Sequence, residues 1–437
     1  MDGAKFPQSK DALRKEVMLF ESPYTDIAIQ SCHYEKKSSI TGINEPFGQI
    51  VFEYQGTSDN YLDLAQSYLY VSGKVVKADG TAATSNDDYS VTNLFLHSLF
   101  ENVTLSLNGT EVENAGSNYP WLAYNKILLG NGQGTKTSEL TSQLFYKDSD
   151  PKTAAVSNEG YKNRKALVTT SAHLEMCGKL QLDIMQSTKY IPNGVSLTLK
   201  LTKSAPEFYL WTPAEPATGD PIPFKFKFDE VYLVLKKLSL NPSVITKNEA
   251  QLKRGTPMRI PLRKTEIRTF TIPTGSFNFA TENLFNGRLP ERVFVSFIDA
   301  SAYSGKISEN PFNYKHYDLE FIKTVVEEKT NYSSEIAVDF ANNRFLEGYM
   351  SLFGAVKPGE DGNFIDRTEY GKDGNVIFSF EILCPTSMDA LVPQRNGEVK
   401  ILAKFRKALT APTTAIIMGV FANMITIDEK RKVKSLL

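Results

Sequence analysis

The chain has 437 residues, of which 41% are hydrophobic and 11% aromatic, and its formal net charge is −1. This length exceeds one ordinary β-sandwich and suits two domains of about 200 residues each. The near-neutral charge excludes a protein that wraps nucleic acid over its whole surface, because such a protein would be strongly basic. No stretch approaches the ~20 apolar residues that cross a bilayer, and the N-terminus lacks the apolar core of a signal peptide. We therefore expect a protein made and used in the cytosol or nucleus.

We predict an N-terminal arm over residues 1–45, because the first convincing strand pattern comes after it. Within the arm, Leu13, Val17 and Phe20 fall on one face of a short helix expected over residues 10–20. An apolar stripe so early in the chain has no core of its own to join. We expect the arm to pack on its own subunit or on a neighbouring one.

Alternation of apolar and polar residues is the dominant pattern of the rest of the chain, and it predicts strands with one buried face. The first clear strand, over residues 103–107, runs into Asn108-Gly109, a pair typical of tight β-hairpins because both residues tolerate positive φ. Further alternating runs cover residues 195–202, 224–229, 376–383 and 399–406. We predict antiparallel β-sandwiches whose cores include Leu105, Leu197, Leu199, Phe226, Phe378 and Phe405.

Two short buried helices are expected at residues 121–129 and 345–353, and their sequences align when the chain is offset by about half its length. Trp121 aligns with Phe345, and Leu, Leu and Gly coincide at later positions. This match indicates a duplicated domain. We place the junction near Leu240-Asn241-Pro242, which gives a first sandwich over residues 46–241, a second over 242–428 and a basic tail over 429–437.

No catalytic, cofactor-binding or metal-binding residues are predicted, and no cofactor is expected. The four histidines (His33, His97, His173 and His316) share neither metal-ligand nor triad spacing, and Cys32, Cys177 and Cys384 lie too far apart in sequence for a paired zinc motif. The sequence contains no Walker loop, no G-x-S-x-G motif and no H-E-x-x-H motif. The basic run from Lys430 to Lys434 indicates either a solvated tail or a contact with nucleic acid, a lipid headgroup or an import receptor.

Several segments together resemble the double jelly-roll major capsid proteins of Polinton/Maverick elements and adintoviruses, including relatives embedded in animal genomes. The resembling segments are VMLFESPYTDI at 17–27, NYLDLAQSYLYV at 60–71, NLFLHSLFENV at 93–103, ENLFNGRLPERV at 282–293, NPFNYKHY at 310–317 and IDEKR at 427–431. One departure follows Arg292, where the family has a glycine-rich strand and this chain reads VFVSFID. That departure bears on how close the relationship is and leaves the expected fold unchanged.

The resemblance implies an all-β fold of two tandem jelly rolls with short helices in the loops, and a structural role without catalysis. It also implies a homotrimer that tiles an icosahedral virion capsid around a double-stranded DNA genome, beside neighbouring capsomers and a single jelly-roll penton protein. The arm and the basic tail would lie on the inner side of the shell, where they would contact the genome or an inner membrane weakly.

Two other functions stay open at this point. A carbohydrate-binding or carbohydrate-cleaving β-sandwich would carry exposed tryptophans clustered in one cleft, and the chain has only Trp121 and Trp211. A capsid-like protein domesticated for a host role would have the same sequence features as a virion component. The assembly state separates the first alternative from a capsid protein, because a capsid protein is expected to be a stable trimer.

Overall fold

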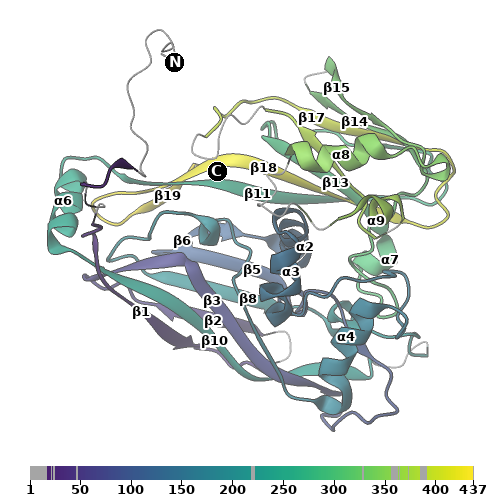
Figure 1. The fold of residues 1–437 in the computed structure, drawn as a ribbon, viewed down its shortest axis with the longest axis horizontal. Helices are drawn as coiled ribbons and strands as arrows, with labels where there is room; N and C mark the ends of the chain where they lie inside the picture. Colours follow the sequence, from purple (N-terminus) through teal and green to yellow (C-terminus); the bar gives the residue numbers. More distant parts are fainter. Residues whose placement is uncertain are drawn as a thin grey trace.

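The chain folds into two β-sandwiches that lie side by side (Figure 1). The computed structural model describes residues 17–20, 22, 25–45, 48–217, 222–326, 329–355, 363, 365–372, 374–383 and 391–436. Helix α6 (Pro242–Lys253) connects the last strand of the first sandwich to the first strand of the second. Within these ranges, no helix combines the length and the apolar character needed to cross a bilayer.

The first sandwich is a jelly roll of eight antiparallel strands. One sheet has the order β1 (Ile29–Ser38), β10 (Phe224–Leu240), β3 (Asn60–Lys77) and β7 (Leu174–Gly178), and the other has the order β2 (Gln49–Tyr54), β8 (Leu197–Lys203), β5 (Phe100–Leu107) and β6 (Thr110–Asn114). Two short strands, β4 (Ser90–Val91) and β9 (Leu210–Trp211), pair outside these sheets. When the eight main strands are numbered along the chain, without β4 and β9, one sheet has the order 1-8-3-6 and the facing sheet has the order 2-7-4-5.

The second sandwich repeats this topology strand for strand. One of its sheets has the order β11 (Met258–Ile272), β18 (Thr413–Ile427), β13 (Arg292–Asp299) and β16 (Ile377–Glu381). The other has the order β12 (Asn278–Ala280), β17 (Val399–Phe405), β14 (Leu319–Val326) and β15 (Lys329–Ala337), and both sheets are antiparallel. A short strand, β19 (Val433–Ser435), adds to β18. The predicted all-β fold of two tandem jelly rolls is therefore confirmed.

Alternation in the sequence places the core as predicted. Leu105, Leu197, Leu199, Phe226, Phe378 and Phe405 are all buried. Between β5 and β6, Asn108 and Gly109 have φ of 47° and 76°, the left-handed conformations that a two-residue hairpin turn requires. One continuous apolar core runs through both sandwiches, so they fold against each other as well as around themselves.

The helices lie in the connections between strands. They are α1 (Phe95–Ser98), α2 (Tyr119–Gly130), α3 (Gln133–Thr137), α4 (Glu159–Val168), α5 (Pro206–Tyr209), α7 (Ala300–Tyr303), α8 (Leu346–Ala355) and α9 (Arg367–Gly371). The two helices predicted from the repeated sequence are α2 and α8. Each follows the fifth main strand of its sandwich and precedes the sixth, so the two helices occupy equivalent places in one topology, which a duplicated domain would give.

The N-terminal arm is shorter than predicted, because β1 lies inside the range 1–45. β1 is an edge strand that pairs with β10 only, and most of its residues are exposed. Because both of its faces carry polar residues, it lacks the apolar alternation that predicted strands such as β8 and β17. Of the helix predicted over residues 10–20, Leu13 lies outside the described residues, and Val17 and Phe20 are exposed.

Candidate interaction surfaces

The two sandwiches meet at a junction in which α2 of the first packs on the segment that follows β13 in the second. The indole of Trp121 stacks on Tyr303 with ring centroids 4.5 Å apart, and its Nε1 donates to the main-chain oxygen of Pro311 at 3.0 Å. Tyr124 stacks on Phe312 at 4.3 Å between centroids. Because α2 also packs on β5 of its own sandwich, nearly every residue of the helix is buried.

A buried polar group links the same two sandwiches beside α2. The carboxylate of Asp183 accepts hydrogen bonds from the main-chain nitrogen of Thr265 at 2.7 Å and from its hydroxyl at 3.0 Å, and it pairs with Lys126. The carboxylate of Glu113 accepts from the main-chain nitrogens of Asp183 and Ile184. Burial, with the nearby charge of Asp183, raises the pKa of Glu113 to about 8. The junction thus includes a carboxyl group that titrates near neutral pH.

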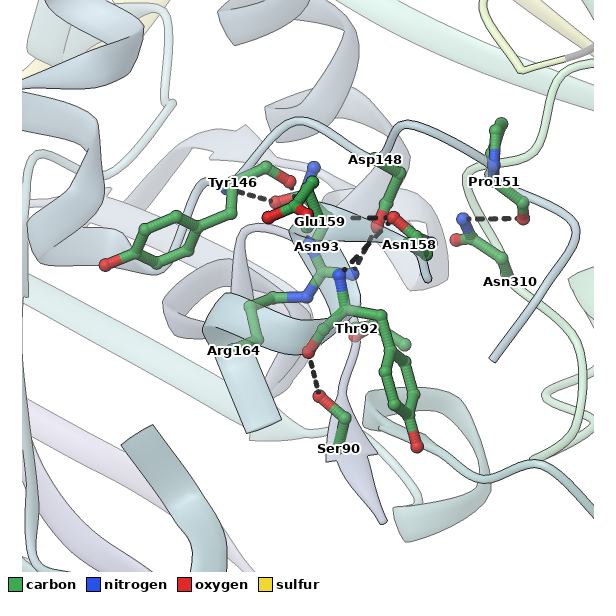
Figure 2. Close-up of polar contacts among 12 residues, drawn as sticks. Ser90, Thr92, Asn93, Tyr146, Asp148, Pro151, Asn158, Glu159, Arg164 and Asn310 are labelled. Atoms are coloured by element: carbon green, nitrogen blue, oxygen red, sulfur yellow. Dashed lines mark hydrogen bonds and ion pairs between the residues drawn. The ribbon is translucent and has the colours of Figure 1, made fainter. Parts of the chain in front are cut away.

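A second buried polar cluster, around Arg164 of α4, organises the long connection between β6 and β7 (Figure 2). Its guanidinium donates to the main-chain oxygens of Val91 at 2.9 Å and Tyr146 at 2.8 Å, and to Asp148 Oδ1 at 2.7 Å. Burial raises the pKa of Asp148, and pairing with Arg164 opposes that shift. Since these partners hold the guanidinium in place, the cluster is a structural framework. The sequence carried no signal that would have singled it out.

Three of the histidines have separate partners, and the fourth is exposed. His97 is buried, with its ring nitrogens 2.8 Å from the hydroxyl of Tyr119 and 2.8 Å from Gln143 Oε1, and burial lowers its pKa to about 4. His316 stacks on Phe340, His173 lies 3.7 Å from Asp229, and His33 is exposed on β1. Within the described ranges, no three His, Cys, Asp or Glu side chains gather as metal ligands would. Cys384 lies outside those ranges.

The exposed tryptophan cleft expected of a carbohydrate-binding sandwich does not form. Trp121 packs in the junction, and Trp211 is buried with the ring of Tyr161 against it. The chain has no other tryptophan. This placement removes the feature that the carbohydrate alternative required.

The outer face of the first sandwich's β1-β10-β3-β7 sheet carries a group of tyrosines that we call the tyrosine face: Tyr34, Tyr68, Tyr70 and Tyr232. Tyr34 is 54% exposed and the other three are half-buried. Tyr70 and Tyr232 stack with their centroids 4.3 Å apart, and Lys36 Nζ lies 4.6 Å above the Tyr232 ring. Tyrosine is enriched in protein interfaces, so this open aromatic surface is suited to a partner.

The corresponding face of the second sandwich is covered by the first. Thr265 of β11 points to Asp183 of the first sandwich, and Ile267, two residues later, lies on the same face of the sheet. Met418 and Phe294 stand in register with Ile267 on the neighbouring strands, and both are buried. The face that is open in the first sandwich therefore faces the junction in the second.

The two repeated helices also differ in exposure: the helix of the first sandwich is covered and that of the second is open. Leu122 of α2 is 2% exposed, whereas its sequence equivalent Leu346 of α8 is 52% exposed and Met350, one turn further, is 54% exposed. We call Leu346 and Met350 the α8 face. The repeated helix is thus almost wholly buried in the first sandwich and has an exposed apolar face in the second.

The basic C-terminal run is not a free tail, contrary to one prediction from the sequence. β19 pairs with β18, and Arg431 binds residues of the first sandwich. Lys430, Lys432 and Lys434 remain exposed on the surface. Val433 is buried, so this segment alternates between contact with the protein and contact with solvent.

The fold defines the class as a double jelly roll, and the comparisons with known proteins agree. No family model matches the chain. An uncharacterized protein of Caenorhabditis elegans, F54H12.2, is 25% identical over 421 residues, covering 92% of this chain and 97% of that protein.

Solved structures of viral proteins share the fold across the whole chain. A chain of the Sputnik virophage structure superposes with a TM-score of 0.63 at 12% identity, covering 100% of this chain and 95% of its own. The major capsid protein of Faustovirus gives 0.59 at 10% identity, covering 94% and 92%, and that of mavirus gives 0.55 at 10% identity, covering 99% and 97%. At these identities the likeness shows a common fold.

Proposed function

We propose that this protein is a non-enzymatic major capsid protein of the Polinton/Maverick and adintovirus type. Its homotrimers would tile an icosahedral shell around a double-stranded DNA genome. The observation that carries the proposal is an asymmetry between two sandwiches of one topology. One sheet face is covered in the second sandwich and open in the first, and the repeated helix is buried in the first and exposes Leu346 and Met350 in the second.

A contact between unlike surfaces repeats until its rotation closes a ring. In this chain, the α8 face of one copy would meet the tyrosine face of the next, as the first sandwich meets the covered sheet of the second within the chain. Three chains with two sandwiches each would close such a ring with six similar corners. A trimer with six similar corners can pack side by side with its neighbours in a shell, as hexagons do in a plane.

The remaining parts of the proposal concern the ends of the chain and its partners. We propose that residues preceding β1 pack along the base of the trimer, with Lys430, Lys432 and Lys434 on the same inner side. These exposed lysines would contact the genome or an inner membrane weakly. Neighbouring capsomers and a single jelly-roll penton protein would complete the shell, after synthesis in the host cytoplasm.

The experiment is a mass measurement of the purified chain by size-exclusion chromatography with light scattering. We expect a trimer with interfaces well above ~1,000 Å². Leu346→Asp and Met350→Asp should each give monomers, because a carboxylate on the α8 face would be buried without a partner. Val156→Asp is the matched control, since Val156 is 61% exposed and lies in neither face.

The proposal fails if the natural chain stays monomeric at tens of micromolar, or if both α8 variants remain trimeric. Circular dichroism must show that the monomeric variants keep their strands. Electron microscopy of the expressed protein then tests the shell itself.

A host role for a domesticated copy is the second candidate, and one observation favours it. The C. elegans protein matches nearly its full length to this chain, as a capsid-like gene carried in an animal genome would. Under this proposal the trimer forms as above, but the native source contains the protein outside any particle. Sedimentation of the native material, with and without nuclease, distinguishes the two.

A further inference from the structure

A cavity of about 540 Å³ opens between the two sheets of the first sandwich, and neither the junction nor either open face uses it. It lies where β3 and β8 end and β5 and β10 begin. Its apolar wall consists of Val76, Leu99, Pro206, Tyr209, Phe226 and Phe228. The volume falls within the ~300–1,000 Å³ that is typical of small-molecule sites.

The wall of the cavity is held in place by hydrogen bonds of the protein itself. The side chain of Asn44 donates to the main-chain oxygen of Phe228 at 2.8 Å and accepts from its nitrogen at 3.1 Å. The hydroxyl of Tyr209 accepts from the main-chain nitrogen of Phe226 at 3.1 Å. Because these contacts need no occupant, the site is preformed. Ser204 also lines it, and its buried hydroxyl has no hydrogen-bond partner among the described residues.

Charged residues also line the cavity, with three lysines, Lys203, Lys225 and Lys227, and two carboxylates, Glu45 and Glu101. Lys203 and Lys225 each donate to a main-chain carbonyl, at 2.8 Å and 2.6 Å. An ammonium group has three donors, so both keep donors for a ligand. Burial lowers the pKa of Lys203, so an anion beside it would favour its charged form.

We propose that this cavity binds an amphipathic anion, namely a long-chain carboxylate. Its hydrocarbon chain lies along the phenylalanines between the sheets, and its carboxylate meets the lysines. The excess of lysines over carboxylates sets the preference for a negative head group. This site is independent of the proposed assembly, and binding at it is measured separately from the mass of the trimer.

The test is isothermal titration calorimetry of the full chain with dodecanoate, kept below its micelle concentration. Dodecanol and dodecyltrimethylammonium serve as neutral and cationic probes of the same chain length. We expect one saturable site per chain that binds dodecanoate about tenfold more tightly than dodecanol, as a charge-assisted hydrogen bond implies. Equal affinity for all three probes, preference for the cation, or no binding overturns the proposal.

Two pairs of variants locate the site. Ala205 is exposed and lines the cavity, so Ala205→Phe should fill the cavity and abolish binding, whereas Ala82→Phe, at an exposed alanine outside the lining, should not. Lys203→Gln should weaken dodecanoate binding about tenfold, while Lys200→Gln on the same strand leaves it unchanged. Dodecanoate binding that survives Ala205→Phe in a folded protein refutes this site. Thermal unfolding of each variant confirms that it is folded.

Discussion

Arg431 holds Asn193 through two parallel hydrogen bonds, from Nε to the main-chain oxygen and from Nη2 to Oδ1, both at 2.9 Å. Arg431 lies in the turn between β18 and β19 of the second sandwich, and Asn193 precedes β8 of the first. Arg431 also pairs with Glu249 of α6. One side chain therefore fastens the second sandwich to the first and to the helix that connects them.

Replacing Arg431 should loosen this attachment. Arg431→Ala removes the partner of a main-chain carbonyl and an amide, so we expect the free energy of unfolding to fall by about 1–3 kcal/mol in urea titrations at fixed protein concentration. Lys430→Ala, at the exposed neighbouring position, should change it by less than about 0.5 kcal/mol. If the two variants are equally stable, the hydrogen bonds to Asn193 contribute nothing measurable.

Glu113 should make the junction sensitive to pH. Its pKa is about 8 in the folded chain against an ordinary 4.5, so between these values the folded state holds a proton that the unfolded state has lost. Stability must then fall as the pH rises through this window. Between about pH 5 and pH 8 the free energy of unfolding of the natural chain should fall by at least ~1 kcal/mol more than that of the Glu113→Gln variant.

The control for this experiment is Glu111→Gln, an exposed carboxylate on the same strand. It should follow the pH profile of the natural chain. Parallel profiles for all three proteins would contradict the role given to Glu113.

His97 has the opposite dependence. Burial lowers its pKa to about 4 from 6.5, so the unfolded chain binds the proton first as the pH falls. Above pH 6.5 the protonation of His97 does not affect the free energy of unfolding. As the pH falls from 6.5 toward 4, the preference of the unfolded chain for the proton lowers the free energy of unfolding by up to about 3 kcal/mol. His97→Gln should reduce this acid loss in denaturant titrations at several pH values. His33→Gln, on exposed β1, should not, and an unchanged acid profile in His97→Gln would refute the prediction.

Deletion of residues 1–20 should leave both sandwiches folded and weaken trimers or shells. Val17 and Phe20 are exposed in the single chain, so deleting them removes no contact within the subunit. Their deletion weakens assembly only if a neighbouring subunit covers their apolar surface. Light scattering over a dilution series measures the change in trimer dissociation. A truncated protein that assembles as well as the full chain has no need of the arm.

The class of fold can be predicted from the sequence alone, because the periodicity of apolar residues is a local property. Alternating runs such as residues 195–202 can bury only one face, and the similarity of the two helical segments indicates a duplicated domain. β1 escaped detection for the same reason, since an edge strand with two polar faces has no period to read. The Asn108-Gly109 hairpin followed from the φ values that those two residues tolerate.

Which surfaces are covered and which stay open depends on how the two sandwiches pack in three dimensions. Leu122 and Leu346 are identical residues at equivalent positions, yet one is buried and the other lies on the surface. The partners of Arg164, Asp183 and Arg431 come from distant parts of the chain, and hydrogen bonds between them depend on how the two sandwiches pack. A linear pattern carries no record of that packing, because contact across a junction is set by three-dimensional proximity and not by spacing along the chain.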